Sequence, residues 1–187
     1  LSYRSANFLP ACLRALSASD YPRMEILVVD NASPDHSAEV ARRTADELEL
    51  AVKLLPLARN LGCAGGNNVG WRESRGEFVV FLNPDAEVRP DTVRELVRPM
   101  MDDPTIGVTG AKIYWPGTRR IQHAGGRIYP NAMTDHWGKG EEDHGQHDVP
   151  RDVDYVTGAG FAVRRCVLER LHGFDEEYFP AYYEETD

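Results

Sequence analysis

The sequence predicts an α/β fold with a doubly wound, mostly parallel sheet. Strand and helix signals alternate through the first half of the chain, as in proteins built from βαβ units. The two clearest strand signals, residues 26–29 and 78–82, are continuous apolar runs typical of strands buried on both faces of a parallel sheet. Both runs end in polar, acidic sequence. Because ligands bind beyond the carboxyl ends of the strands in such sheets, we expect a ligand site there.

The composition is that of a globular protein. The 187 residues are 42% hydrophobic and 27% charged, which fits one domain with a hydrophobic core. The net charge of −9 argues against a general nucleic-acid binder, because a phosphate backbone would meet a repulsive average field. The three cysteines are far apart, which indicates reduced thiols in a cytosolic setting rather than a disulfide framework. No signal peptide is recognisable, and no apolar run approaches the roughly 20 residues that span a bilayer.

The first elements follow from apolar spacing and from turn residues. Residues 8–16 carry apolar side chains at helical spacing, with Pro10 in the first turn where proline is tolerated. The strand of residues 26–29 follows and ends at Asp30. Ser33 is predicted to cap a second helix that has Pro34 at its first position. The residues expected to face inward from this helix are Val40, Ala41, Thr44, Ala45 and Leu48.

The middle of the chain continues the alternation. A short strand is expected over residues 52–57, and a glycine-rich turn at 60–66 is expected to lead into a short helix at 67–72. After the strand of residues 78–82, a helix from about Pro90 is predicted to stop at Pro99.

The second half is less regular. From about residue 115 to residue 152 the periodicity disappears, and such segments are usually functional or mobile. Order returns over residues 155–163, followed by a helix at 165–171 that Gly173 closes.

Asp85 is the strongest single candidate for chemistry. It follows a buried strand in the turn of residues 83–85 (Asn-Pro-Asp), and a carboxylate there is a suitable hard ligand for Mg²⁺ or Mn²⁺. The alternative is a plain turn, because all three residue types favour turns. Similarly, Asp30 could accept hydrogen bonds from a base or ribose, or residues 30–33 could simply be a capped strand-to-helix turn.

Two further groups carry open alternatives. The C-terminal residues Glu184, Glu185 and Asp187 form a carboxylate cluster after an aromatic stretch, which suits a general base but also fits a solvated acidic tail. His144 and His147 could ligate a metal, although solvated loop histidines are the favoured interpretation.

Taken together, these segments resemble the family 2 glycosyltransferases, and specifically their rhamnosyltransferase-like branch. The resemblance implies a GT-A type, Rossmann-like fold with an irregular acceptor-side segment. The matching segments occur in the family's order and cover nearly the whole chain: residues 28–33, 60–68, 75–85, 157–160, 173–176 and 183–187. Because that family's first strand should precede Leu1 and more chain normally follows, we expect a single catalytic domain truncated at both ends. Residues 1–114 would then be the nucleotide-sugar-binding half, and residues 115–187 the acceptor-side and catalytic-base half.

The resemblance also implies roles for individual residues. Asp30 would read the nucleobase, Asp85 would bind the metal, and Glu185 would be the general base, with Glu184 and Asp187 beside it. Asn83 stands where relatives often have Asp, and Glu185 where they have Asp, so one metal carboxylate is missing and the base reaches one methylene further. The residues expected to bind the nucleotide sugar are Tyr3, Asp30, Asn31, Ser33, Asn60, Gly66, Asn67, Asn83 and Asp85. The acceptor side would be formed by Gly158, Ala159 and Gly160.

The function implied is an inverting, Mg²⁺- or Mn²⁺-dependent transfer from a UDP- or dTDP-sugar to a glycan or lipid-linked acceptor in cell-envelope polysaccharide synthesis. The setting implied is the cytoplasm, with peripheral contact at the inner face of the membrane. Two alternatives stay open: a non-catalytic nucleotide-sugar or glycan-binding module, and a sugar-1-phosphate nucleotidyltransferase. The second lacks support because no glycine-rich N-terminal loop carries Arg and Lys for a triphosphate.

Overall fold

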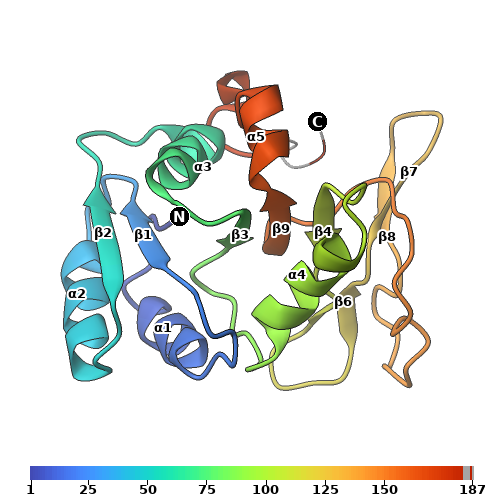
Figure 1. Cartoon of the computed structure of the whole chain (residues 1–187), viewed down its shortest axis with the longest axis horizontal. Helices are drawn as coiled ribbons and strands as arrows, with labels where there is room; N and C mark the ends of the chain where they lie inside the picture. Colours follow the sequence, from blue (N-terminus) through green and yellow to red (C-terminus); the bar gives the residue numbers. More distant parts are fainter. Residues whose placement is uncertain (183–185, 187) are drawn as a thin grey trace.

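The computed structural model describes residues 1–182 and 186. The longer strands form two groups, one on the left and the other in the middle of Figure 1. β1 (Ile26–Asp30) and β2 (Val52–Pro56) pair in parallel, while β3 (Phe78–Leu82), β9 (Gly160–Arg164) and β4 (Val108–Gly110) form a three-stranded sheet in the order β3-β9-β4. The α/β fold class is confirmed.

The predicted mostly parallel sheet is in fact mixed, because β9 runs antiparallel to both β3 and β4. A parallel strand follows a crossover connection, usually a helix, but residues 111–159 between β4 and β9 contain short strands and no helix. Leu82 at the end of β3 pairs with Gly160, and Gly110 at the end of β4 pairs with Phe161. Residues 111–159 therefore leave and re-enter the sheet at the edge where β3 ends.

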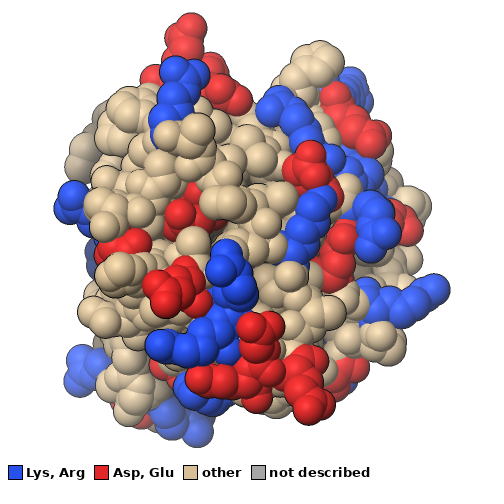
Figure 2. Space-filling model, turned by 90° about the vertical axis from the view of Figure 1, so that its left-hand side faces the viewer, with Lys and Arg blue, Asp and Glu red and all other residues tan. Residues whose placement is uncertain are grey.

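Among the described residues, five α-helices surround the strands: α1 (Leu9–Ser17), α2 (Ser37–Glu47), α3 (Gly62–Glu73), α4 (Thr92–Asp102) and α5 (Arg165–Leu171). α2 packs on β1 and β2, α3 packs on β1, and α4 packs on β4 and β9. Within the described chain, no helix combines the length and the apolar character that crossing a bilayer requires. On the side of the molecule next to α2 and β2, acidic and basic side chains are interspersed rather than segregated (Figure 2).

The prediction that Ser33 caps the second helix was wrong, because α2 begins only at Ser37. The hydroxyl of Ser33 accepts a hydrogen bond from the backbone amide of Arg4 (3.2 Å), which is 29 residues away along the chain. Asp35 takes over near the helix start, where its carboxylate accepts the backbone amide of Ser37 (3.2 Å). Ser33 therefore does accept a backbone hydrogen bond in a turn, but the donor is a distant residue rather than the start of the next helix.

Two other helix boundaries differ from the sequence prediction. The glycine-rich segment is not a turn before a helix, because α3 already starts at Gly62. Its glycines permit close packing: a Cβ on Gly66 would lie 2.3 Å from Leu1 Cδ1. Pro99 does not stop α4, which continues to Asp102. An interior proline costs a helix about 3 kcal/mol, and the burial of Met100 to 1% exposure offsets a comparable amount.

The segment predicted to be irregular contains two short hairpins. One pairs β5 (Ile113–Tyr114) with β6 (Ile121–His123), and the other pairs β7 (Gly126–Ile128) with β8 (Thr134–His136). Asp143 ties the following loop to the first hairpin by accepting hydrogen bonds from the Tyr114 hydroxyl (2.5 Å) and the Lys112 ammonium (3.0 Å). These hydrogen bonds hold the pKa of Asp143 well below its usual range, and the bond from Tyr114 has the largest effect on that pKa.

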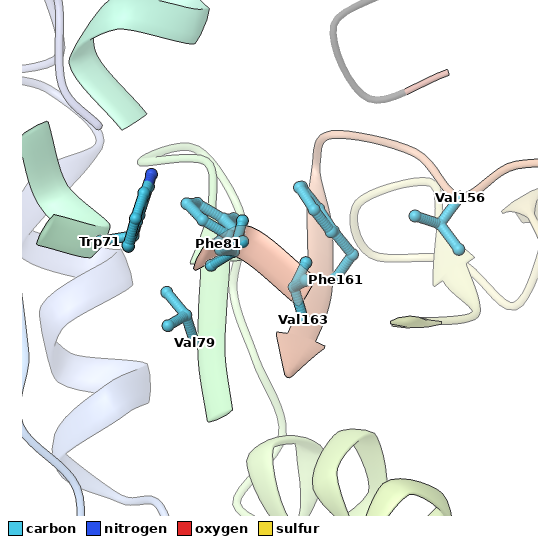
Figure 3. Packing of buried hydrophobic residues seen from close by; sticks show 7 residues of the cluster. Trp71, Val79, Phe81, Val156, Phe161 and Val163 are labelled. Carbon is cyan, nitrogen blue, oxygen red and sulfur yellow. The ribbon is translucent and has the colours of Figure 1, made fainter. Parts of the chain in front are cut away.

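The core around β3 and β9 fixes the end of β3. Phe81 and Phe161 stack with ring centroids 5.0 Å apart, and Trp71 from α3 and Val79 pack in the same cluster (Figure 3). A second cluster lies between α1, α2 and β1. Buried apolar side chains of this kind supply most of the stability of such folds.

A cavity of about 1040 Å³ separates β1 from β3. Leu27 and Val29 line it from one side, and Val79 and Phe81 from the other. In the part of the chain that the structure describes, no strand hydrogen bonds join β1 to β3. Ser2 also pairs with β1, since its amide donates to Val29 O (2.7 Å) and its carbonyl accepts the amide of Asn31 (2.8 Å).

Candidate functional site

Asp85 lies in the turn directly after β3, and its side chain is exposed. The turn is held by backbone contacts on Asn83, whose amide donates to Ala159 O (3.1 Å) and whose carbonyl accepts the amide of Ala86 (3.1 Å). Within the described residues, the Asp85 carboxylate makes no hydrogen bond. It is thus presented on a fixed backbone with its oxygens available.

This arrangement fits a hard divalent cation. Mg²⁺ and Mn²⁺ prefer oxygen ligands and are commonly held by one or two protein carboxylates together with substrate phosphates. Among residues 1–182 and 186, no three His, Cys, Asp or Glu side chains group closely enough to form a complete metal site. Asp85 therefore suits an ion that a bound diphosphate helps to hold, rather than a cation bound by protein alone.

Asp30 ends β1 and is buried to 5% exposure. One carboxylate oxygen, Oδ2, accepts the backbone amide of Ser33 (3.3 Å). The other, Oδ1, has no hydrogen-bond partner among the described residues. A buried acceptor without a partner costs free energy, so a donor from a ligand would stabilise this site.

The neighbours of Asp30 complete this end of β1. Ser2 forms a parallel bridge with Asp30, and its buried hydroxyl also lacks a partner within the described chain. Tyr3 follows with a side chain that is 43% exposed, and the Arg4 guanidinium lies 5.4 Å from its ring centroid. An exposed aromatic ring beside an unpaired carboxylate oxygen can hold a flat heterocycle by stacking and hydrogen bonding.

Asn31 uses its buried amide within the protein. Its Nδ2 donates to Asn60 Oδ1 (3.1 Å) and Gly62 O (2.9 Å), and its Oδ1 accepts the amide of Leu61 (2.8 Å). Both amide hydrogens are occupied, so this geometry does not support donation from Asn31 to a nucleotide. Asn31 instead positions the loop that begins α3.

The other predicted donor-site residues are dispersed around α3. Gly66 packs against Leu1, as described above, and Asn67 donates to Cys63 Sγ (3.5 Å). Asn67, Asn83 and Asp85 are among the residues that line the large cavity. Ser33 lies further out and contacts the backbone of Arg4.

Sequence reasoning missed Asn68, which is buried to 1% exposure. Its Nδ2 donates to Phe174 O (2.9 Å) and to Glu176 Oε1 (2.9 Å), while its Oδ1 accepts Trp71 Nε1 (3.1 Å) and the amide of Phe174 (2.9 Å). The tandem asparagines in the glycine-rich segment, with tryptophan three residues on, were the available signal. Asn68 anchors the C-terminal segment to α3.

The predicted catalytic residues Glu184, Glu185 and Asp187 lie outside the described residues. The chain that leads to them is held at the start of α3 as far as Pro180, whose carbonyl accepts the amide of Cys63 (2.8 Å). At the same place, a Cβ on Gly62 would lie 2.8 Å from Phe179 Cδ2.

The predicted acceptor-side residues lie beside the turn that carries Asp85. Ala159 O accepts the amide of Asn83, and Gly160 O accepts the amide of Ala111 (3.1 Å). The structure therefore brings Asn83, Ala159 and Gly160 together at the end of β3. Gly158 precedes them in the same segment.

The histidines expected to be solvated do not behave alike. His147 has a side chain that is only 11% exposed, with Nε2 3.3 Å from Glu141 Oε2 and Nδ1 3.0 Å from Arg151 Nη2. The prediction of a solvated side chain is wrong for His147, whereas His144 is exposed.

Comparison with known proteins identifies relatives along nearly the whole chain. The family described as Glycosyl transferase family 2 matches residues 1–171. The uncharacterized protein y4gI of Sinorhizobium fredii is 28% identical over 97% of this chain and 20% of its own length. The O-antigen biosynthesis protein RfbC of Myxococcus xanthus is 32% identical over 87% of this chain and 13% of its own length. The chain thus spans a fifth or less of these two relatives.

Solved structures with the same fold are also found. A mannosyltransferase from Pyrobaculum calidifontis, in complex with GDP-Man and Mn²⁺, matches with a TM-score of 0.69 and 26% identity over 94% of this chain and 46% of that one. S. aureus TarS in complex with UDP-GlcNAc matches with a TM-score of 0.66 and 19% identity over 99% of this chain and 49% of that one. The second likeness shows the GT-A fold alone.

Proposed function

The chain belongs to glycosyl transferase family 2, and from this we propose that it is the donor-binding and catalytic part of an inverting glycosyltransferase. The enzyme transfers a sugar from a nucleoside diphosphate to a hydroxyl group of a glycan or lipid-linked acceptor. The reaction belongs to cell-envelope polysaccharide synthesis. Residues 1–114 bind the donor in this proposal, and residues 115–187 supply the acceptor side and the base.

One observation carries the proposal. The buried carboxylate of Asp30, with one unpaired oxygen, and the exposed carboxylate of Asp85 stand at the ends of β1 and β3. A nucleotide sugar has a base that donates hydrogen bonds and a diphosphate that associates with a cation, so it matches these two groups in kind. The Pyrobaculum relative, crystallised with GDP-Man and Mn²⁺, supports the same assignment.

On the donor side, Asp30 Oδ1 accepts a hydrogen bond from the base, and the exposed ring of Tyr3 packs beside it. Asp85, on the backbone held by Ala159, is the residue that would hold Mg²⁺ or Mn²⁺. When bound, such an ion neutralises the negative charge of the diphosphate leaving group. Asn31 and Asn60 keep the loop before α3 in place and do not contact the reacting atoms.

On the acceptor side, Glu185 accepts the proton of the acceptor hydroxyl. Glu184 precedes it directly in sequence, and Asp187 follows two residues later. The hydroxyl oxygen forms a bond to the anomeric carbon while the bond from that carbon to the diphosphate breaks. Attack from the face opposite the leaving group inverts the configuration. The anchor from Asn68 to Phe174 supports the chain segment that carries this base.

Several finer assignments belong to the same proposal. We assign the chain to the rhamnosyltransferase-like branch on the order of its motifs, and a UDP- or dTDP-sugar as donor. The three cysteines are few and far apart in the sequence, which favours a reducing compartment, so we place the enzyme in the cytoplasm, in contact with the inner face of the membrane where a lipid-linked acceptor is found.

The first test is a thermal-shift titration of this chain and of Asp85→Ala with UDP, dTDP and GDP, each with and without Mn²⁺. A ligand at about a hundred times its Kd adds roughly 2.7 kcal/mol to the stability of the folded state, which raises Tm by several degrees. We expect one nucleotide to give a Mn²⁺-dependent shift that Asp85→Ala abolishes. Asp30→Asn should weaken the same nucleotide, since it replaces the unpaired acceptor.

The proposal fails in two distinguishable ways. If no nucleotide shifts the melting temperature, the chain does not bind the donor. If a nucleotide binds equally well to Asp85→Ala at limiting Mn²⁺, Asp85 does not hold the ion. In a preparation that transfers sugar, Glu185→Gln must reduce turnover while nucleotide binding persists.

A further inference from the structure

A second, smaller cavity of about 140 Å³ lies beside the turn that carries Asp85. The residues Ile113, Trp115, Gln122 and Ala159 line both this cavity and the large one. Ala159, which lines the small cavity, also accepts the amide of Asn83 at the end of β3, so the cavity lies beside that strand end. His123, His136, Lys139 and Thr157 complete its walls.

The walls combine an aromatic ring with polar groups that are not engaged elsewhere. Trp115 is 44% exposed. In the part of the chain that the structure describes, the side chains of Gln122, Lys139 and Thr157 make no hydrogen bonds. Lys139 is the single charged group among the lining residues. A mixture of donors and acceptors around an indole ring suits a neutral sugar, whose hydroxyls both donate and accept and whose CH face packs on aromatic rings.

The volume of the small cavity is suited to a single sugar ring. Its volume is roughly ten times the space that a single water molecule needs. It is smaller than the about 300–1,000 Å³ of pockets that enclose drug-sized ligands, so a nucleoside diphosphate does not fit.

A pair of histidines supplies a defined donor. His123 is buried to 2% exposure, and its Nδ1 lies 2.6 Å from Nδ1 of His136, so one of the two nitrogens carries the shared hydrogen. His123 Nε2 is buried without a partner among the described residues. Since buried N–H groups without partners are rarer than unpaired acceptors, we assign the hydrogen of His123 to Nδ1, donating to His136. His136, which lines the cavity, then carries its own hydrogen on Nε2.

Both rings are neutral at neutral pH. Burial, reinforced by His136, lowers the pKa of His123 to about 4, and burial also lowers the pKa of His136. The pair therefore adds a hydrogen-bond donor without adding charge.

We propose that this cavity is the subsite for one neutral pyranose ring of the acceptor. Trp115 stacks against the CH face of the ring, and His136, Gln122 and Thr157 bind its hydroxyl groups. This assignment deepens the proposed glycosyl transfer and rests on it, because the subsite lies beside the turn that would hold the donor diphosphate.

The test measures binding rather than turnover. Saturation-transfer NMR of this chain, with UDP and Mn²⁺ present, is recorded with the methyl glycosides of glucose, galactose, rhamnose and N-acetylglucosamine as probes. We expect saturation transfer to at least one glycoside at millimolar concentration. Trp115→Ala should weaken the binding of that glycoside about tenfold, and Thr157→Val should weaken its binding as well.

Tyr129→Ala is the matched control, because Tyr129 is a similarly exposed aromatic residue (38%) outside the cavity. It should leave glycoside binding unchanged, and all three variants should keep the nucleotide-induced thermal shift. The subsite is overturned if no glycoside binds, or if Trp115→Ala and Thr157→Val bind it as the unchanged chain does. If the unchanged chain binds the glycoside but shows no nucleotide-induced thermal shift, the result contradicts the proposed donor site and leaves the sugar subsite standing.

Discussion

Asn68 provides the sharpest stability prediction. Replacing it by alanine removes an amide that makes four hydrogen bonds, two of them to the backbone of Phe174 and one each to Trp71 and Glu176. The three hydrogen bonds to Phe174 and Glu176 connect α3 to a segment more than a hundred residues later in the chain. Alanine itself is a good helix former, so any loss of stability comes from the lost contacts rather than from the helix.

The magnitude follows from what the substitution leaves unpaired. Trp71 is buried to 8% exposure, so its indole N–H keeps no partner, which costs about 1–3 kcal/mol. Each of the three other hydrogen bonds contributes about 0.5–1.5 kcal/mol. Together these terms give a loss of about 2.5–7.5 kcal/mol, and thus a decrease in Tm of roughly 5–30 °C for a chain of this size.

The assay compares Asn68→Ala with Asn67→Ala by thermal and urea unfolding. Asn67 is the adjacent asparagine on the same helix and is half-buried. Within the described residues its side chain makes a single hydrogen bond, to Cys63 Sγ at 3.5 Å, so its replacement should change the stability by less than about 1 kcal/mol. Hydrogen exchange adds a local readout, because the amide of Phe174 should lose protection in Asn68→Ala. Equal melting temperatures for the two variants, or unchanged exchange at Phe174, would refute the anchoring role.

Three further outcomes are expected. Met100→Ala should lower the free energy of unfolding by about 2–5 kcal/mol because Met100 is buried, whereas Met101→Ala, at 65% exposure, should have little effect in the same urea titration. Asp143→Asn should lower the free energy of unfolding by about 1–3 kcal/mol, because Lys112 loses a buried partner at 3.0 Å. The pKa of Asp143 is held below its usual value of 3.8, so the contribution of the carboxylate to stability is present above pH 3.8 and is lost as the pH falls below it. Urea titrations at several pH values will measure this loss. Burial lowers the pKa of His123 from 6.5 to about 4, so between these pH values the unfolded chain binds more protons than the folded one. The free energy of unfolding should therefore fall by up to about 3 kcal/mol as the pH decreases from 6.5 to 4. A His123→Gln variant should show a flatter profile of Tm against pH.

The sequence was sufficient for those elements whose signal is contained in the element itself. The apolar run at 78–82 became β3 with the predicted bounds, and the helix at 165–171 became α5. In both cases a buried apolar face and local turn residues agree on the same boundaries. The position of Asp85 after β3 followed from the same local pattern.

The missed features depend on contacts between distant residues. Ser33 is a good capping residue, yet Arg4 occupies its hydroxyl. The direction of β9 depends on a long connection that returns to the edge where β3 ends, which apolar periodicity does not encode. Asn68 has a structural role only because Phe174 and Glu176 fold back onto α3. The region of Glu185 falls outside the described residues, so its role as the base stays a prediction.

The turn after β3 joins two distant parts of the chain. The amide of Asn83 donates to Ala159 O at 3.1 Å, and Leu82 pairs with Gly160 at the start of β9. Asp85 therefore stands on backbone that a segment more than seventy residues later holds in place. A substitution at residues 159–160 that shifts this backbone is expected to displace the Asp85 carboxylate without contacting it.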